Sequence, residues 1–361
     1  IVHHTALTGT YIGDAAVYTF FVLSGFLIMG LLRKSRMQIE ARQTSVMAEL
    51  KRFWLGRALR IFPVYYLALA VMLSLGWGLG LHQDLIAHAG WYLAYLQNFH
   101  IGLVSKQWGP FSHVWSLAVE QQFYVLFGLA LLIAPLRHHR RVLMCTLAAC
   151  ALGHYLLSAW AVDDITPYTM PMAGFAYILG GCLVSTIGQR PAWAELSPRT
   201  RDIVIGMMVV VIIATAILPN AENGTWSRYL PLDSASMTLG MVVLYSAFLW
   251  AIANSQDTRL VRWLEIRPLR YAGQISYALY VVHFPLIEFN RHLLERTGWI
   301  HEHLATTNFF MTLIGSALLA SLSMHLMERP IAQAKGRILA RCSRRADLPL
   351  REAPESLQPR S

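Results

Sequence analysis

Two adjacent histidines, His3 and His4, stand shortly before a long apolar stretch. A neutral imidazole can take a proton from a hydroxyl group near neutral pH, and a hydroxyl that keeps its proton is a poor nucleophile. The pair is therefore a candidate general base for transferring a group onto a hydroxyl. Two ordinary interfacial histidines at the end of a helix would give the same pattern, so position alone leaves both interpretations open.

Arg57 and Arg60 lie three residues apart, so their guanidinium groups share one face of a helix. Forked donors of this kind bind phosphate oxygens in pairs, and coenzyme A carries such phosphates. The two arginines are thus candidates for binding a phosphate-bearing donor at the membrane edge. Simple anchoring of a helix by basic residues is the alternative, and it is sufficient for the nearby Lys51 and Arg52.

Glu120 is a carboxylate several residues inside an apolar stretch, beside the amides Gln121 and Gln122. An unpaired charge in a bilayer is costly, which makes a functional role the default interpretation. Hydrogen bonding to another helix and direct catalysis both explain a carboxylate at this position.

A second polar stripe consists of Tyr277, Tyr280 and His283, which recur every three residues and so lie along one side of a helix. Pro285 follows and loosens the backbone there. The histidine is a candidate for relaying or accepting a proton. A packed stripe that contains a hydrogen-bonded histidine is the alternative.

The elements that must position these residues are membrane helices. Of 361 residues, 55% are hydrophobic and 14% are charged, whereas soluble domains are ~25% charged. The apolar residues form blocks of about 20, the length that crosses a bilayer as a helix. We place spans at 12–32, 61–81, 114–136, 142–161, 168–188, 203–218, 235–253, 272–290 and 307–327. With a first helix truncated at Ile1, this predicts an all-α integral membrane protein of about ten helices.

The basic residues alternate with the apolar blocks. Of the 30 Lys and Arg residues, 26 fall in segments that would face one side: 33–60, 137–141, 189–201, 254–271 and 329–361. The positive-inside rule makes that side cytoplasmic, together with both termini. This distribution explains the net charge of +10 without nucleic-acid binding. We expect a membrane domain at 1–330 and a disordered basic tail at 331–361. The four cysteines lack metal-ligand spacing, so neither a zinc site nor a disulfide framework is expected.

Five motifs in this order resemble the bacterial membrane acyltransferase family 3, the integral-membrane O-acyltransferases of surface polysaccharides and some antibiotics. The motifs are His3-His4 with Phe20-Phe21-Val-Leu-Ser24-Gly25-Phe26; Arg57-x-x-Arg60-Ile-Phe-Pro63; Trp115-Ser116-Leu-Ala-Val-Glu120-Gln-Gln122-Phe-Tyr124; Ser276-Tyr277-x-x-Tyr280-x-x-His283-x-Pro285; and Glu328-Arg329-Pro330. The resemblance implies a ten-helix domain, an acyl-coenzyme A donor on the cytoplasmic face and a sugar acceptor on the outer side.

The resemblance also implies an essential histidine at the end of the first helix, and His4 fits that place better than His3. The expected catalytic residues are thus His4, His3, Glu120 and His283, with Arg57 and Arg60 at the donor. Further motif residues are Ser24, Trp115, Ser116, Tyr124, Ser276, Tyr277, Tyr280 and Glu328. No metal and no tightly bound cofactor is expected.

The sequence departs from the family pattern at three places. Tyr18 stands where an Asp is frequent, which puts the partner of His4 in doubt, and Gln121 replaces a second Glu. A basic residue ten positions before the essential histidine would precede Ile1.

The expected activity is transfer of an acyl group, acetyl being the expected case, from acyl-coenzyme A to a surface saccharide such as the O-antigen of lipopolysaccharide. The setting would be the bacterial inner membrane. A transporter or flippase would also place polar groups in a bilayer, but transporters usually show repeated halves, and no repeat is visible here. A glycerolipid-type acyltransferase fails because no histidine has an Asp five residues later. The acceptor, the acyl chain, the oligomeric state and the choice between direct transfer and a covalent intermediate stay open.

Overall fold

The computed structural model describes residues 12–79, 82–109, 111–188, 190–217, 234–296 and 304–336, and these contain helices and no strand. The long helices are α2 (Ile12–Glu40), α3 (Val46–Leu79), α7 (Trp115–Ile133), α8 (His139–Trp160), α10 (Pro171–Thr186), α12 (Pro198–Ile217), α14 (Ser234–Ala253), α16 (Arg267–Arg296) and α17 (Leu304–Ser323). A π-helical turn, η6 (Met324–Glu328), continues α17, and the helix runs on to Gly336. The all-α class is confirmed.

All nine expected spans are helices. Within the described residues, eight are long and apolar enough to cross a membrane, and α16 is the long helix that falls outside this set. It is long enough, but polar residues in its middle, such as Gln274, His283 and Glu288, make it less apolar than the others. The first helix expected from the sequence, with His3 and His4, lies outside the described residues.

The third span begins well before the expected residue 61, because α3 starts at Val46. The Ser45 hydroxyl caps it by accepting from the backbone N–H of Ala48 at 3.2 Å. Gly56 is the one Gly or Pro between Val46 and the apolar stretch, and a helix tolerates a single glycine. Arg57 therefore lies inside a continuous helix rather than at its first turn.

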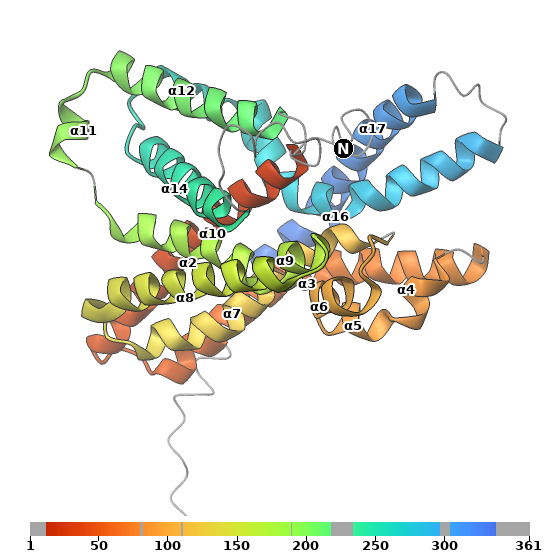
Figure 1. Ribbon diagram of the computed structural model, residues 1–361, viewed down its shortest axis with the longest axis horizontal. Helices are drawn as coiled ribbons and strands as arrows, with labels where there is room; N and C mark the ends of the chain where they lie inside the picture. The colour runs from red at the N-terminus through yellow and green to blue at the C-terminus, as the bar shows by residue number, and fades with distance from the viewer. Residues whose placement is uncertain are drawn as a thin grey trace, which may run out of the picture.

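The centre of the molecule is a close crossing of α2 and α10 (Figure 1). A Cβ built on Gly25 would lie 1.9 Å from the carbonyl oxygen of Ile178, and one on Gly181 would lie 1.9 Å from that of Val22. Small residues let two membrane helices approach backbone to backbone, which is how they gain packing energy in lipid. Helices α7 and α8 pack beside this pair, while α12 with α14 and α16 with α17 form two hairpins to its sides (Figure 1).

The connection between α3 and α7, which falls between two expected spans, is a string of short helices. These are α4 (Gln83–Ala87), α5 (Ala89–Leu93), α6 (Gln97–Phe99), the π turn η1 (His100–Ser105) and the 3-10 turn η2 (Ser112–Val114). They pack against α3 and α7 (Figure 1). At the other end, the helix extends past the domain boundary expected at residue 330 to Gly336. The expected tail from 337 on lies outside the described residues.

Candidate active site

Glu120 is buried in the protein interior, where it is shared by two helices. The hydroxyls of Ser24 on α2 and Tyr124 on α7 both donate to its Oε1, and these two hydroxyls lie 2.8 Å apart. All three side chains are at least nine-tenths buried. The carboxylate thus has the interhelical partners that a buried acidic group needs. Gln122, two residues on, faces elsewhere and bonds Asn98 at 2.8 Å.

Three basic side chains, Arg57, Arg60 and Lys335, gather near Glu120, and we call them the cation group. The charges of Arg57 and Arg60 both act on this carboxylate. Lys335, from the helical residues 329–336, joins them: its Nζ lies 3.4 Å from the carbonyl oxygen of Gly56 and within electrostatic reach of both arginines. Gly56 leaves room for this approach, since a Cβ there would come within 3.1 Å of the Lys335 ammonium. Three cations gathered at one place suit a phosphate-bearing ligand.

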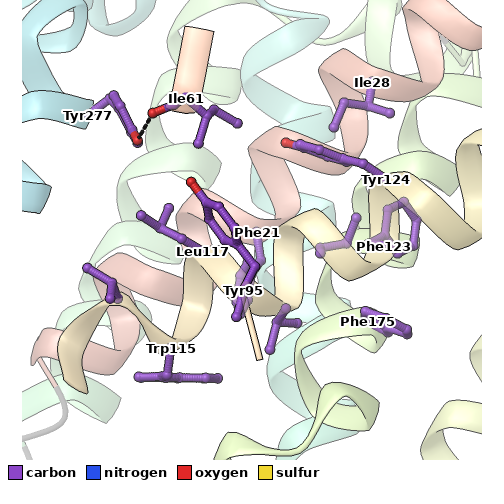
Figure 2. Close-up of a cluster of buried hydrophobic side chains, with 14 of the residues drawn as sticks. Phe21, Ile28, Ile61, Tyr95, Trp115, Leu117, Phe123, Tyr124, Phe175 and Tyr277 are labelled. Carbon is purple, nitrogen blue, oxygen red and sulfur yellow. Dashed lines mark hydrogen bonds between the residues drawn. The ribbon is translucent and has the colours of Figure 1, made fainter. Parts of the chain in front are cut away.

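The stripe on α16 packs against two different helices. Tyr277 is buried and donates from its hydroxyl to the carbonyl oxygen of Ile61 on α3 at 2.7 Å (Figure 2). Glu328 is half-buried, accepts from the Ser323 hydroxyl at 3.1 Å and is acted on by the charge of Arg60. Both residues therefore belong to the surroundings of the cation group.

One turn further along α16, the stripe meets the start of α7. The Tyr280 hydroxyl lies 2.7 Å from Ser116 Oγ and donates to the backbone carbonyl of His113. The rings of His113 and His283 meet edge to face, with their centroids 5.2 Å apart. Trp115 is buried beside them and packs on Tyr168 at 4.7 Å. We call Ser116, Tyr280, His113 and His283 the outer polar cluster, because the basic residues predict the outer side for this end of α7. It holds two histidines, of which the sequence had indicated one.

The hydrogen bonds of the outer polar cluster fix which ring nitrogen of each histidine carries a proton. Pro285 has no N–H, so the helical acceptor four residues earlier, the carbonyl of Val281, lacks its usual donor. His113 Nε2 lies 3.2 Å from that oxygen, and His283 Nδ1 lies 2.7 Å from the carbonyl oxygen of Tyr280. A carbonyl only accepts, so both nitrogens must donate. In the neutral rings, His113 Nδ1 and His283 Nε2 are then the basic atoms.

The remaining expected site residues either lie away from these clusters or fall outside the described residues. Ser276 is exposed, and its hydroxyl donates to the carbonyl of Gly273 in its own helix. His3 and His4 lie outside the described residues. Tyr18, at the position of the frequent Asp, stacks on Tyr177 of α10 with ring centroids 4.1 Å apart. Within the described residues, no group of three His, Cys, Asp or Glu side chains could hold a metal ion.

Polar groups therefore follow one another along α3, α7 and α16, from the cation group through Glu120 to the two histidines. A family model described as an acyltransferase domain matches residues 1–326 of the sequence. The chain belongs to this family. The acyltransferase resemblance drawn from the five motifs is thereby confirmed, and the transporter alternative loses its support.

Relatives of this acyltransferase family member include two O-acetyltransferases. O-acetyltransferase OatA of Staphylococcus aureus (strain NCTC 8325 / PS 47) is 26% identical over 346 residues, which cover 90% of this chain and 53% of that protein. Peptidoglycan O-acetyltransferase OatA of Listeria monocytogenes is 25% identical over 359 residues, covering 92% and 53%. BcsY of Komagataeibacter xylinus, named as a membrane-bound transacylase, is 30% identical over 304 residues, covering 81% and 70%. The chain thus spans about half the length of the OatA relatives. No solved structure shows significant similarity.

Sequence reasoning missed two residues that this acyltransferase fold brings into the site. Lys335 was assigned to a disordered tail, and only the continuation of the last helix carries it back to Arg57. His113 precedes Ser116 by three residues and so shares its helix face, a spacing that could have singled it out. It lies just before the span expected to begin at residue 114, so the sequence pattern did not place it on the same helix.

Proposed function

We propose that the chain transfers an acyl group, acetyl in the simplest case, from acyl-coenzyme A to a hydroxyl of a cell-surface saccharide. The observation that supports this is the line of polar residues across the helix bundle. It begins at the cation group, passes Glu120 and Tyr277, and ends at the outer polar cluster. The bilayer core is on the order of 30 Å thick. A donor bound by its phosphates at one end must therefore reach into the bundle with its pantetheine arm, or hand its acyl group over on the way.

The donor end is formed by Arg57, Arg60 and Lys335. Guanidinium groups bind phosphate oxygens through paired hydrogen bonds, and an ammonium adds a compact point charge. Two carboxylates feel the charge of these arginines: Glu120, whose Oε1 already has two donors, and the half-buried Glu328. The cations thus keep an excess of positive charge for an anionic ligand. Orientation follows from the basic residues, which favour a cytoplasmic donor end in the bacterial inner membrane.

The chemistry requires a base at the acceptor end. The acceptor hydroxyl oxygen attacks the thioester carbonyl carbon, its proton passes to the base, and the carbon–sulfur bond breaks. The sulfur leaves as the coenzyme A thiolate and takes up a proton. A positioned general base contributes ~10²–10⁴-fold. We assign this role to His4, with His3 beside it and with His283 Nε2 as the relay or rival base.

The proposed acceptor is a class of molecule, the saccharides of the cell surface. The Listeria relative is named for peptidoglycan, so peptidoglycan glycan and other surface polysaccharides are the acceptors to test first. A saccharide hydroxyl is the nucleophile that a histidine base serves. The lipid bilayer is the remaining partner.

The test uses membranes from cells that express the full protein, supplied with acetyl-coenzyme A labelled in the acetyl group. Label should enter the saccharide fraction in wild-type membranes. It should not do so with Arg57→Lys together with Arg60→Lys, at equal protein level, because lysine keeps the charge but loses the fork. Alanine at His4, His3 and His283 then separates the bases. Equal labelling by the arginine variant would refute the donor site, and activity retained by His4→Ala but lost by His283→Ala would reassign the base.

A further inference from the structure

Tyr95 occupies a backbone position that normally belongs to glycine. Two backbone hydrogen bonds turn the chain back at the end of α5. The Leu96 N–H donates to the carbonyl oxygen of Trp91 at 2.8 Å, and the Tyr95 N–H donates to that of Tyr92 at 3.3 Å. The residue just past the helix end must adopt the left-handed conformation, and Tyr95 has a φ of 55°. For a residue other than glycine this conformation costs about 1–2 kcal/mol. A side chain kept at such a position needs a reason.

The ring of Tyr95 is held firmly. It stacks on Tyr65 with centroids 4.3 Å apart and on Phe62 at 5.4 Å. Its carbonyl accepts from Gln122 of α7 at 3.0 Å, and the Tyr65 hydroxyl fixes the end of α5 by donating to the Tyr92 carbonyl at 2.8 Å. Aromatic stacking explains a ring here, but a phenylalanine would stack equally well. Packing therefore does not account for the hydroxyl.

The hydroxyl of Tyr95 is buried and has no hydrogen-bond partner among the described residues, in a side chain that is 6% exposed. Its neighbours differ: the Tyr65 and Tyr66 hydroxyls both donate to backbone carbonyls of α5. A buried polar group left unpaired costs about 1–3 kcal/mol, so such groups are rare. Figure 2 shows this hydroxyl directed toward the Tyr277–Ile61 hydrogen bond, and Tyr277 and Glu120 both act on it electrostatically.

We propose that the Tyr95 hydroxyl donates a hydrogen bond to a carbonyl oxygen of the donor's pantetheine–thioester arm. Its place, between the cation group and the outer polar cluster, is where the arm of a donor bound by its phosphates would pass. That arm offers amide and thioester carbonyls, which are acceptors. Among the described residues no protein group accepts from this hydroxyl. The nearby Tyr277 hydroxyl donates to Ile61, and Glu120 Oε1 accepts from Ser24 and Tyr124. This role rests on the proposed use of acyl-coenzyme A.

The experiment compares two ligands on the purified full-length protein. Acetyl-coenzyme A has phosphates and arm, whereas adenosine 3′,5′-bisphosphate has phosphates and no arm. Tyr95→Phe should bind acetyl-coenzyme A about five- to tenfold more weakly, the loss of one hydrogen bond, and bind the bisphosphate like wild type. Its thermal stability should not fall, because it removes an unpaired group. The control Tyr66→Phe, which removes a paired hydroxyl, should lose stability and keep affinity for both ligands.

Two results overturn the role of Tyr95 and leave the donor site standing. One is unchanged acetyl-coenzyme A affinity in Tyr95→Phe, as expected for a hydroxyl served only by water. The other is an equal loss of both ligands, which would mean a disturbed fold. Failure of the proposed function looks different, because wild-type protein would then bind neither ligand, or Arg57→Lys would bind both normally.

Discussion

His113 Nε2 lies 3.2 Å from the carbonyl oxygen of Val281, at the turn of α16 where Pro285 has no N–H to donate. The proline thus does more than loosen a helix: it exposes an acceptor that anchors the start of α7 to α16. The same contact brings the His113 ring to the edge of His283.

Pro285→Ala should lower acyl transfer without lowering the amount of folded protein. Alanine supplies an N–H to Val281 and favours the helix by ~3 kcal/mol over proline, but its N–H competes with His113. Activity and membrane level are measured for Pro285→Ala, His113→Ala and the double variant. The two changes act on one contact, so the double variant should fall no further than His113→Ala. Full activity in Pro285→Ala would show that the contact is incidental.

We expect Glu120 to stabilise the site through its hydrogen bonds rather than to act directly in catalysis. Glu120→Ala removes the acceptor of the buried Ser24 and Tyr124 hydroxyls. One of them can then donate to the other, 2.8 Å away, but the second is left unpaired at about 1–3 kcal/mol. Glu120→Gln keeps an acceptor oxygen, so we expect a smaller loss of stability and of activity. Thermal denaturation of the solubilised variants, beside transfer assays, gives both quantities. Unchanged stability with complete inactivity in Glu120→Gln would instead indicate direct catalysis.

Gly181→Ala should prevent normal folding. The new methyl group would lie 1.9 Å from the Val22 carbonyl oxygen, so α2 and α10 must separate along their crossing. Overpacking typically costs 1–3 kcal/mol and more where backbone is displaced. The control is Gly240→Ala on α14, where a Cβ meets nothing within 4 Å. That change should be neutral or stabilising by up to ~1 kcal/mol. Equal levels of both folded variants would contradict the close crossing.

The segment around His100 should open more readily in acid. Burial, and then the neighbouring His88, lower the pKa of His100, while Asp84 acts in the opposite direction. Its ring is buried, 4.3 Å from that of His88. In the unfolded chain it binds a proton near pH 6.5. The neutral ring therefore stabilises the fold above that pH, and the contribution is lost as the pH falls toward the lowered folded value.

Hydrogen exchange of residues 97–105 measures this effect. As the pH falls from about 7.5 to about 5, intrinsic amide exchange slows. These amides should exchange faster than that slowing alone allows, and this difference is the excess to be measured. His100→Leu keeps the side chain apolar and should remove the excess. An excess that persists in that variant would assign the pH dependence to another group.

The sequence patterns predicted the long helices because apolar length is a local property. Contacts between distant segments were beyond them. Nothing near Glu120 indicates that Ser24, far along the chain, supplies a partner. Lys335 reaches the site because the last helix continues to Gly336. Tyr95 reaches it because the chain turns back after α5, in the connection between α3 and α7. An unpaired hydroxyl such as that of Tyr95 becomes visible only when its neighbours are known.

The most direct test of the account is mass spectrometry of surface saccharides. It compares cells that carry the intact gene, cells without it, and cells with Arg57→Lys and Arg60→Lys at normal protein level. The account predicts an added mass of one acyl group on saccharide repeats in the first cells, absent from the other two. Identical saccharide masses in all three, with the wild-type protein present in the membrane, would contradict it.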